Sequence, residues 1–391
     1  MSSEGSDRPR RTLGTAFDPS SNSLNLLRLL LAGLVLLGHS TVVYDFGPSE
    51  NIRDRTSIAT LGIFGFFAIS GFLIAGSAAR SRPWPYLRKR ILRIFPGFWA
   101  ALIVVALVIA AVSWHFAPGI ADCDLGCYYR IGQDGPWSYI WRNLTLWINQ
   151  PGIAKTPHDY IFFGWNLPLW SLVYEFGCYL LLLLLAIVGV LKRSWLVALL
   201  AAAVWAVEIG CMLMPSSVQS INLLTAPVLL HSLTLAPIFL VGSALWALRD
   251  RIPDSPWIAA ACTAGFVASL WVPLGPTAAT AALSTASVAA PLLVYPVLWL
   301  GFHLPFTHIG RRNDYSYGVY IYAYPLQLLL VAVGATGLGL IGFNLVTIAL
   351  TAVFAFASWH LIEKRSIALA HRRSGSDRAP VEAAPEEPQP V

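Results

Sequence analysis

Long apolar runs follow one another along most of the chain and predict its architecture. A helix needs roughly 20 residues to cross the hydrocarbon core, and lipid offers no partner to a free backbone N–H or C=O. The runs do not alternate apolar and polar residues, as the strands of a membrane barrel would. We therefore predict an all-α, polytopic membrane bundle of about ten transmembrane helices, at 24–43, 58–79, 92–114, 167–191, 194–213, 223–248, 257–273, 278–301, 314–335 and 338–362.

Composition supports a membrane protein and argues against a nucleic-acid partner. Hydrophobic residues make up 56% of the chain and charged residues 12%, about half the charged fraction of a soluble domain. The net charge is +6, but the basic residues form short clusters between apolar runs rather than one continuous stripe. Such clusters are typical of a membrane-orientation signal.

The basic clusters also predict the orientation of the helices. If both termini are cytoplasmic, every dense cluster falls on the cytoplasmic side, as the positive-inside rule requires. These clusters lie in the N-terminal tail, at 80–93, 192–193, 249–251, 311–312 and 364–373. We expect a multi-pass protein of the plasma membrane, which in a bacterium is the inner membrane, in contact with its lipids.

The chain divides into one membrane domain and two tails. Residues 1–20 are polar and basic, and residues 367–391 are rich in Pro, Glu and Ala, so we predict both as disordered around a domain at 21–366. The long loop at 115–166 carries Cys123 and Cys127, which can form a local disulfide if the loop faces an oxidising compartment. The cysteines lack ligand spacing, and we predict no metal site.

Three ionisable residues inside apolar helices are candidates for function, because charge within a membrane is costly. Arg28 and His39 are eleven residues apart, so they project from nearly the same helix face about 16 Å apart along the axis. Glu175, near the start of the fourth helix, would lie about 12 Å inside it and can reach His39. The alternatives are a snorkelling arginine, a core histidine and a carboxylate that only joins two helices.

Basic and hydroxyl-bearing residues suggest a site for a phosphorylated donor. Arg88, Arg90 and Arg93 lie where the third helix begins on the cytoplasmic side and, with Arg28, can bind phosphate groups; membrane anchoring or anionic lipid binding is the alternative. Pocket-lining candidates, for which helix packing or a tyrosine belt is the alternative, are Ser70, Trp170, Ser171, Tyr317 and Tyr320.

Several segments together resemble the acyltransferase family 3 membrane proteins, over roughly 24–363. They are Arg28 with His39, GFFAISGFLI at 65–74, LRKRILRIFP at 87–96, LWSLVYEF at 169–176 and DYSYGVYIYAYP at 314–325. The resemblance implies transfer of an acyl group, commonly acetyl from acetyl-CoA, to a hydroxyl of a sugar, cell-envelope glycan or glycosylated, macrolide-type metabolite. It also implies that Arg28, His39, Glu175, Arg90 and Arg93 are functional. Many members carry a histidine where this chain has Ala323, so this chain departs from the family pattern at that position.

We therefore predict a membrane O-acetyltransferase with acyl-CoA as co-substrate and no permanently bound cofactor. In this hypothesis His39, oriented by Glu175, is the general base that removes the proton of the acceptor hydroxyl. The alternative is a proton-coupled transporter of a small solute, in which His39 and Glu175 relay protons. The two halves of the chain show no internal repeat, which favours the enzyme.

Overall fold

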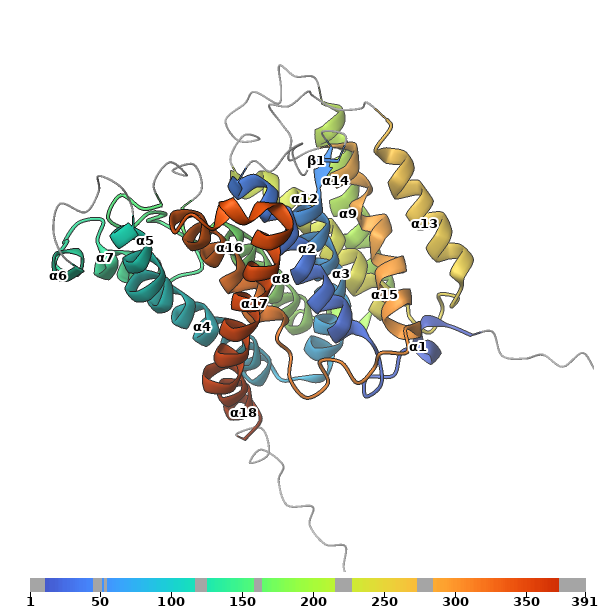
Figure 1. Ribbon diagram of the computed structural model, residues 1–391. Coiled ribbons are helices and arrows are strands. Elements are labelled where there is room, and N and C mark those ends of the chain that lie inside the picture. Colours follow the sequence, from blue (N-terminus) through green and yellow to red (C-terminus); the bar gives the residue numbers. More distant parts are fainter. Residues whose placement is uncertain are drawn as a thin grey trace, which may run out of the picture.

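A computed structural model describes residues 11–44, 51–52, 55–116, 125–157, 164–214, 227–272 and 284–372. It confirms an all-α membrane bundle, in which α2 and α3 run side by side through the centre (Figure 1). The first half of the chain contains α1 (Leu13–Ala16), α2 (Leu24–Tyr44), a small hairpin of β1 (Asn51–Ile52) and β2 (Thr56–Ser57), α3 (Ile58–Arg80), α4 (Pro83–Val104), a π-helix (Val105–Ile109), α5 (Ala110–Phe116), α6 (Leu125–Tyr128) and α7 (Pro136–Arg142).

The second half supplies the remaining helices. They are a 3₁₀ turn (Leu167–Leu169), α8 (Trp170–Ile187), a second 3₁₀ turn (Val190–Lys192), α9 (Ser194–Leu213), α12 (Pro227–Ala247), α13 (Pro256–Ser269), α14 (Thr285–Ala289), a third 3₁₀ turn (Ala290–Leu293), α15 (Val294–His303), α16 (Ser316–Ala332), a fourth 3₁₀ turn (Ala335–Leu338), α17 (Gly339–Ser358), a π-helix (Trp359–Glu363) and α18 (Lys364–Arg372). Each predicted segment has a helical counterpart. Among the described residues, eight helical stretches are long and apolar enough to cross a membrane, while α13 and α16 are shorter.

The third membrane helix begins earlier than predicted. It starts at Pro83 rather than near 92 and runs on through Phe116. Proline is favoured in the first turn of a helix, where its missing N–H costs nothing, whereas the prediction followed only the apolar residues. The basic residues 88–93 therefore lie within α4 rather than at its start.

Both predicted tails are partly ordered. Thr12 caps α1 with a reciprocal capping box, and Leu13 is fully buried. Leu13 N–H also donates to the Ile252 carbonyl. The prediction of disorder through residue 20 is therefore wrong for 11–20, because the buried Leu13 side chain fixes this short segment. At the other end of the chain, α18 continues to Arg372, past the predicted domain end at 366. Residues 1–10 and 373–391 lie outside the described residues.

The segment after α5 contains the long loop predicted at 115–166. Cys127 is disulfide-bonded, while Cys123, the other half of the predicted pair, lies outside the described residues. Trp137 and Trp141 are exposed, whereas Trp165 is fully buried and its Nε1–H donates to Thr156 Oγ1 at 3.2 Å. Trp165 is thus a packing residue of this loop.

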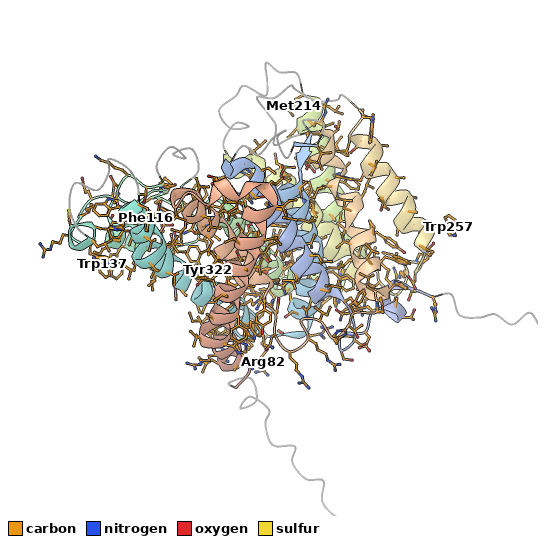
Figure 2. All side chains as sticks on the ribbon, in the orientation of Figure 1. Arg82, Phe116, Trp137, Met214, Trp257 and Tyr322 are labelled. Atoms are coloured by element: carbon orange, nitrogen blue, oxygen red, sulfur yellow. The ribbon has the colours of Figure 1, made fainter. Side chains whose placement is uncertain are left out.

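Large apolar side chains cover the outer surface of the bundle. Phe116, Trp137 and Trp257 point outward, whereas Tyr322 is buried (Figure 2). The exposed apolar set includes residues of nearly every long helix, among them Leu30, Ile103, Leu184, Leu199 and Val353. An apolar surface of this extent is what contact with lipid requires.

Close approach of α3 and α12 at small residues holds the centre of the bundle together. A Cβ added at Gly71 would lie 2.1 Å from the Phe239 carbonyl oxygen, and one at Gly242 would lie 2.7 Å from the Ala68 carbonyl oxygen. Ser243 Oγ donates to the Gly71 carbonyl at 3.1 Å. Small residues at such a crossing allow van der Waals contact between backbones, which drives helix association in lipid.

We expect Gly71→Ala to destabilise the protein by about 1–3 kcal/mol, because its Cβ would force α3 and α12 apart. The measurement is the melting temperature of the protein purified in detergent. Gly33→Ala in α2 is the matched control: no atom of the described residues lies within 4 Å of a Cβ there, and alanine is favoured over glycine in a helix by roughly 0.5–1 kcal/mol. Equal melting temperatures for the two variants would contradict the close packing.

Candidate active site

An ion cluster around Asp314 joins three helices at the basic end of the bundle. Asp314 precedes α16, and its Oδ2 accepts from Arg28 Nη1 of α2 and from Arg93 Nη2 of α4, each at 2.6 Å. Its Oδ1 accepts from the Ser316 backbone N–H at 3.2 Å and from Ser316 Oγ at 2.5 Å. Both oxygens of one largely buried carboxylate are therefore fully used.

The charge of Asp314 follows from these partners. Burial alone would raise the pKa of this carboxyl, but the positive charges of Arg28 and Arg93, with the Ser316 hydrogen bonds, lower it below its usual range. The carboxylate is thus ionised at neutral pH. One ionised carboxylate oxygen therefore accepts from two guanidinium groups, those of Arg28 and Arg93.

A second carboxylate completes the cluster from the other end of the chain. Glu363 Oε2 lies 3.9 Å from Arg93 Nη1, and its Oε1 accepts from Ser358 Oγ at 2.8 Å. Neither Asp314 nor Glu363 is among the site residues predicted from the sequence. The sequence does contain a signal for Asp314. Arginines within apolar helices require anionic partners, and Asp314 is the first residue of the DYSYG segment at 314–318.

Glu175 lies beside this cluster on α8. Its Oε1 accepts from Ser70 Oγ of α3 at 3.0 Å and also from Tyr179 Oη, one turn further along α8. Glu175 and Arg28 line the same small cavity, of about 30 Å³, which is enough for water. A larger ligand therefore needs side-chain movement to enter this cavity, which we name the Glu175 cavity.

Most of the predicted pocket-lining residues meet at the Glu175 cavity. Its wall includes Ser171, Tyr317 and Tyr320, and Ser171 Oγ lies 2.6 Å from Tyr320 Oη. Ser70 reaches Glu175 by its hydrogen bond. Trp170 instead packs against His231, with ring centroids 4.3 Å apart, and lines two neighbouring cavities.

His39 lies away from Glu175, so the predicted contact between them is wrong. His39 Nδ1 lies 2.7 Å from the Val35 carbonyl oxygen, and its ring packs edge-on against Tyr324 at 5.2 Å. Within the described part of the chain, no hydrogen bond or ion pair joins His39 to Glu175.

The reason is the depth at which α8 begins. A Cβ at Gly65 of α3 would touch Leu31, one turn beyond Arg28, and Ser70 lies further toward the basic end. Glu175, bonded to Ser70, is therefore level with Arg28, about 16 Å from His39 along α2. The prediction assumed that the fourth helix starts at the membrane surface, whereas α8 begins deep in the bundle.

The predicted donor-binding arginines have three different environments. Arg28 and Arg93 meet at Asp314. Arg90 donates to Ser77 Oγ at 3.3 Å and lies 5.8 Å from the Tyr86 and Tyr179 ring centroids. Arg88 Nη2 donates to the carbonyls of Leu369 and Ala370, at 2.9 and 2.6 Å. Arg88 therefore anchors α18, while Arg90 reaches the Glu175 cavity through Tyr179.

Comparison with known proteins gives a consistent result. The acyltransferase domain of acyltransferase family 3 matches residues 21–362. Nodulation protein 10 of Rhizobium leguminosarum bv. viciae is 27% identical over 372 residues, which cover 89% of this chain and 94% of that protein. An O-acetyl transferase of Shigella phage Sf6 is 27% identical, covering 88% and 96%. Acyltransferase MdmB of Streptomyces mycarofaciens is 25% identical, covering 42% and 39%. No solved structure matches.

We expect Asp314→Asn to lower the melting temperature at pH 7, because Arg28 and Arg93 lose their shared anion. Removing one partner of a buried ion pair costs about 3–5 kcal/mol. Since the pKa of Asp314 is lowered in the folded state, its stabilisation is complete above the unfolded value of about 3.9 and is lost as the pH falls through the folded value.

The measurement is the melting temperature of both proteins as the pH is lowered from neutral to acid. The advantage of the wild type should shrink below about pH 4. Asp250→Asn is the matched control, because its carboxylate is 70% exposed and, among the residues that the structure describes, pairs only with Arg249; exposed pairs contribute about 0–1 kcal/mol. An equal effect of the two substitutions would count against the cluster.

Proposed function

The chain belongs to acyltransferase family 3, and on that premise we propose that it is a plasma-membrane O-acetyltransferase using acetyl-CoA. The acceptor that we propose is a hydroxyl of a sugar, a cell-envelope glycan or a glycosylated, macrolide-type metabolite. The name of the phage relative supports O-acetyl transfer. The orientation with the basic end in the cytoplasm supports a donor from that side.

The observation that carries the mechanism is the hydrogen bond of His39. A carbonyl oxygen only accepts, so Nδ1 donates its proton to the Val35 carbonyl at 2.7 Å. In the neutral ring the lone pair is then on Nε2, for which no hydrogen-bond partner is found among the described residues. We assign Nε2 as the general base that takes the proton of the acceptor hydroxyl as the oxygen attacks the thioester carbonyl. The C–S bond then breaks, and the CoA thiolate leaves and takes the proton from the imidazolium. In this assignment the Val35 carbonyl, rather than Glu175, fixes the tautomer of the His39 imidazole.

The distance between Arg28 and His39 suits a CoA thioester. CoA carries its phosphates at one end and its thioester at the end of a long, flexible pantetheine arm. The cluster of Arg28 and Arg93 lies at the basic end of the bundle, and His39 lies about 16 Å away along α2. Arg28 and Ile63 both line the Glu175 cavity. Ile63 is next to Gly62, where an added Cβ would touch Val35, and Val35 lies one turn before His39 on α2. A donor entering at the basic end would thus direct its thioester toward His39.

We assign Glu175 to this donor passage rather than to proton transfer. Ser70 and Tyr179 hold its carboxylate at the wall of the cavity, and a carboxylate is a strong acceptor. The pantetheine arm contains two amide N–H donors, which such an acceptor can bind. This role explains why Glu175 is level with Arg28 and not with His39.

We expect His39→Ala to lower the rate of acetyl transfer by about 10²–10⁴-fold, the usual contribution of a general base. The assay measures radiolabel transfer from acetyl-CoA to glycan and glycoside extracts in proteoliposomes, beside uptake of the same solutes. The melting temperature and the affinity for desulfo-CoA should be retained. Wild-type transfer by this variant would refute the assignment of His39, and uptake without any transfer by the wild type would favour a transporter.

We expect Glu175→Gln to act mainly on donor binding, because the glutamine carbonyl still accepts hydrogen bonds but lacks the charge. Hydrogen bonds to charged groups are worth about 1.5–3 kcal/mol, so the KM for acetyl-CoA should rise roughly tenfold. Glu175→Leu, which removes the acceptor, should raise KM further. A loss of kcat as large as that of His39→Ala, at unchanged KM, would instead place Glu175 in proton transfer.

A further inference from the structure

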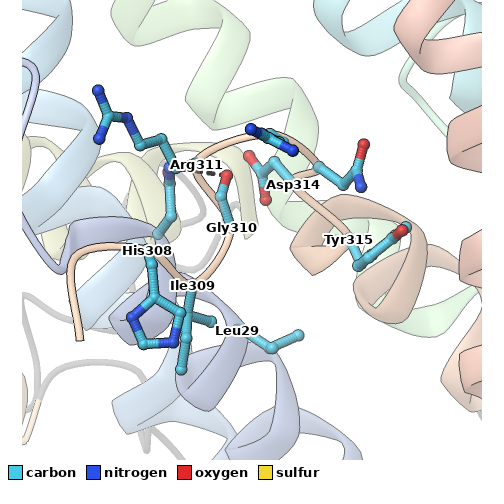
Figure 3. A pocket seen from close by; sticks show the side chains of 10 residues that line it. Leu29, His308, Ile309, Gly310, Arg311, Asp314 and Tyr315 are labelled. Atoms are coloured by element: carbon cyan, nitrogen blue, oxygen red, sulfur yellow. Dashed lines mark hydrogen bonds between the residues drawn. The ribbon is translucent and has the colours of Figure 1, made fainter.

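A large cavity opens at the basic end, on the other side of the Asp314 cluster from the Glu175 cavity. It is formed by the first turns of α2 and by the loop between α15 and α16 (Figure 3), and its volume is about 660 Å³. We name it the basic cavity. That volume lies within the range of about 300–1,000 Å³ for small-molecule sites. Its lining residues include Asn25, Leu29, His308, Arg311, Arg312 and Asn313.

The loop that lines the basic cavity has a fixed shape. Asn25 Nδ2 of α2 donates to the Gly310 carbonyl at 3.0 Å. Gly310 has a φ of +73°, and a Cβ there would lie 2.6 Å from Asn25 Cβ, so only glycine fits this turn. The Arg311 N–H closes the turn onto the His308 carbonyl at 3.4 Å. Arg311 and Arg312 therefore follow an ordered turn, from which the Arg311 side chain projects (Figure 3).

The basic cavity has an excess of positive charge. Among the lining residues that the structure describes, Asp314 is the one carboxylate, and Arg28, Arg93 and Ser316 already occupy both of its oxygens. Neither Arg311 nor Arg312 forms an ion pair within the described ranges. Asp18 comes under the influence of Arg311, but its pKa is lowered chiefly by Ser20 and least by Arg311. Two guanidinium groups thus remain available to an anion.

The Asp314 cluster separates the basic cavity from the Glu175 cavity. Asp314 lines the basic cavity, whereas its partners Arg28 and Ser316 line the Glu175 cavity. A ligand with anionic groups in the basic cavity and a chain reaching inward must pass Arg28. That arrangement fits a molecule with phosphates at one end and a reactive group at the end of a long arm.

We infer that the basic cavity binds the phosphorylated nucleotide end of the acyl-CoA donor, with Arg311 and Arg312 as phosphate ligands. The inference rests on the proposed function and extends it to residues outside the Arg88–Arg93 segment. Arg side chains match phosphate geometry through paired N–H donors. Binding at this cavity leaves the pantetheine arm to enter past Arg28, the residue shared with the Glu175 cavity.

The test compares the wild type with R311Q/R312Q in lipid-free detergent. Isothermal titration calorimetry measures desulfo-CoA binding, and we expect the double variant to bind at least tenfold more weakly, a change of about 1.4 kcal/mol. The KM for acetyl-CoA should rise similarly, while the KM for acetyl-pantetheine, which lacks the nucleotide and its phosphates, should not change. The variant R251Q is the control, because Arg251 is exposed at the same end and does not line the cavity.

The outcomes separate this inference from the proposed function. An unchanged desulfo-CoA affinity in R311Q/R312Q overturns the inference but not the proposed function. The inference is also overturned if the double variant loses only its binding to phosphatidylglycerol vesicles, because the basic cavity would then bind lipid headgroups. A wild type that binds no desulfo-CoA and transfers no acetyl overturns the proposed function as well. If the double variant does not fold, R311Q and R312Q are measured singly, with about threefold weaker binding expected from each.

Discussion

The sharing of one carboxylate oxygen by two arginines sets the geometry of the basic end. Arg28 of α2 and Arg93 of α4 both bind Asp314 Oδ2 at 2.6 Å, so these helices and the start of α16 meet at one point. A cation left unpaired in such surroundings is strongly unfavourable. The positions of the Glu175 cavity, the basic cavity and the Tyr317 ring, 5.8 Å from the Arg93 guanidinium, all follow from this junction.

The junction also gives α2 its role as the axis along which a donor would lie. Arg28 marks the basic end and His39 lies three turns further along the same face, about 16 Å away. Glu175 lies at the level of Arg28, because it accepts a hydrogen bond from Ser70, which lies closer to the basic end than the contact between Gly65 and Leu31. In the proposed mechanism, Arg28 and Glu175 bind the donor at one end of the site, and His39 transfers the proton at the other end. From the sequence, Glu175 and His39 were expected to act together in a single contact.

The sequence predicted the helices well, since apolar length alone identifies a segment that lipid can surround. It also identified Arg28, His39 and Glu175 from the cost of ionisable groups in such segments. It missed Asp314 and Glu363, because the pairing of charges that are hundreds of residues apart depends on tertiary packing. It placed His39 beside Glu175 because hydropathy does not reveal that α8 begins deep in the bundle.

Basic clusters were the least decisive part of the sequence, for a physical reason. Retention of arginine on one side of a membrane, packing against a helix C-terminus and binding of a phosphate all use the same positive charge. In α4, residues three or two apart face different directions, so Arg88 caps α18, Arg90 lies near Tyr179 and Arg93 reaches Asp314. The pair Arg311 and Arg312 fitted the orientation rule as well as any cluster. Only the fixed turn at Gly310 and the already occupied carboxylate of Asp314 distinguish these two arginines as groups with capacity for a further anion.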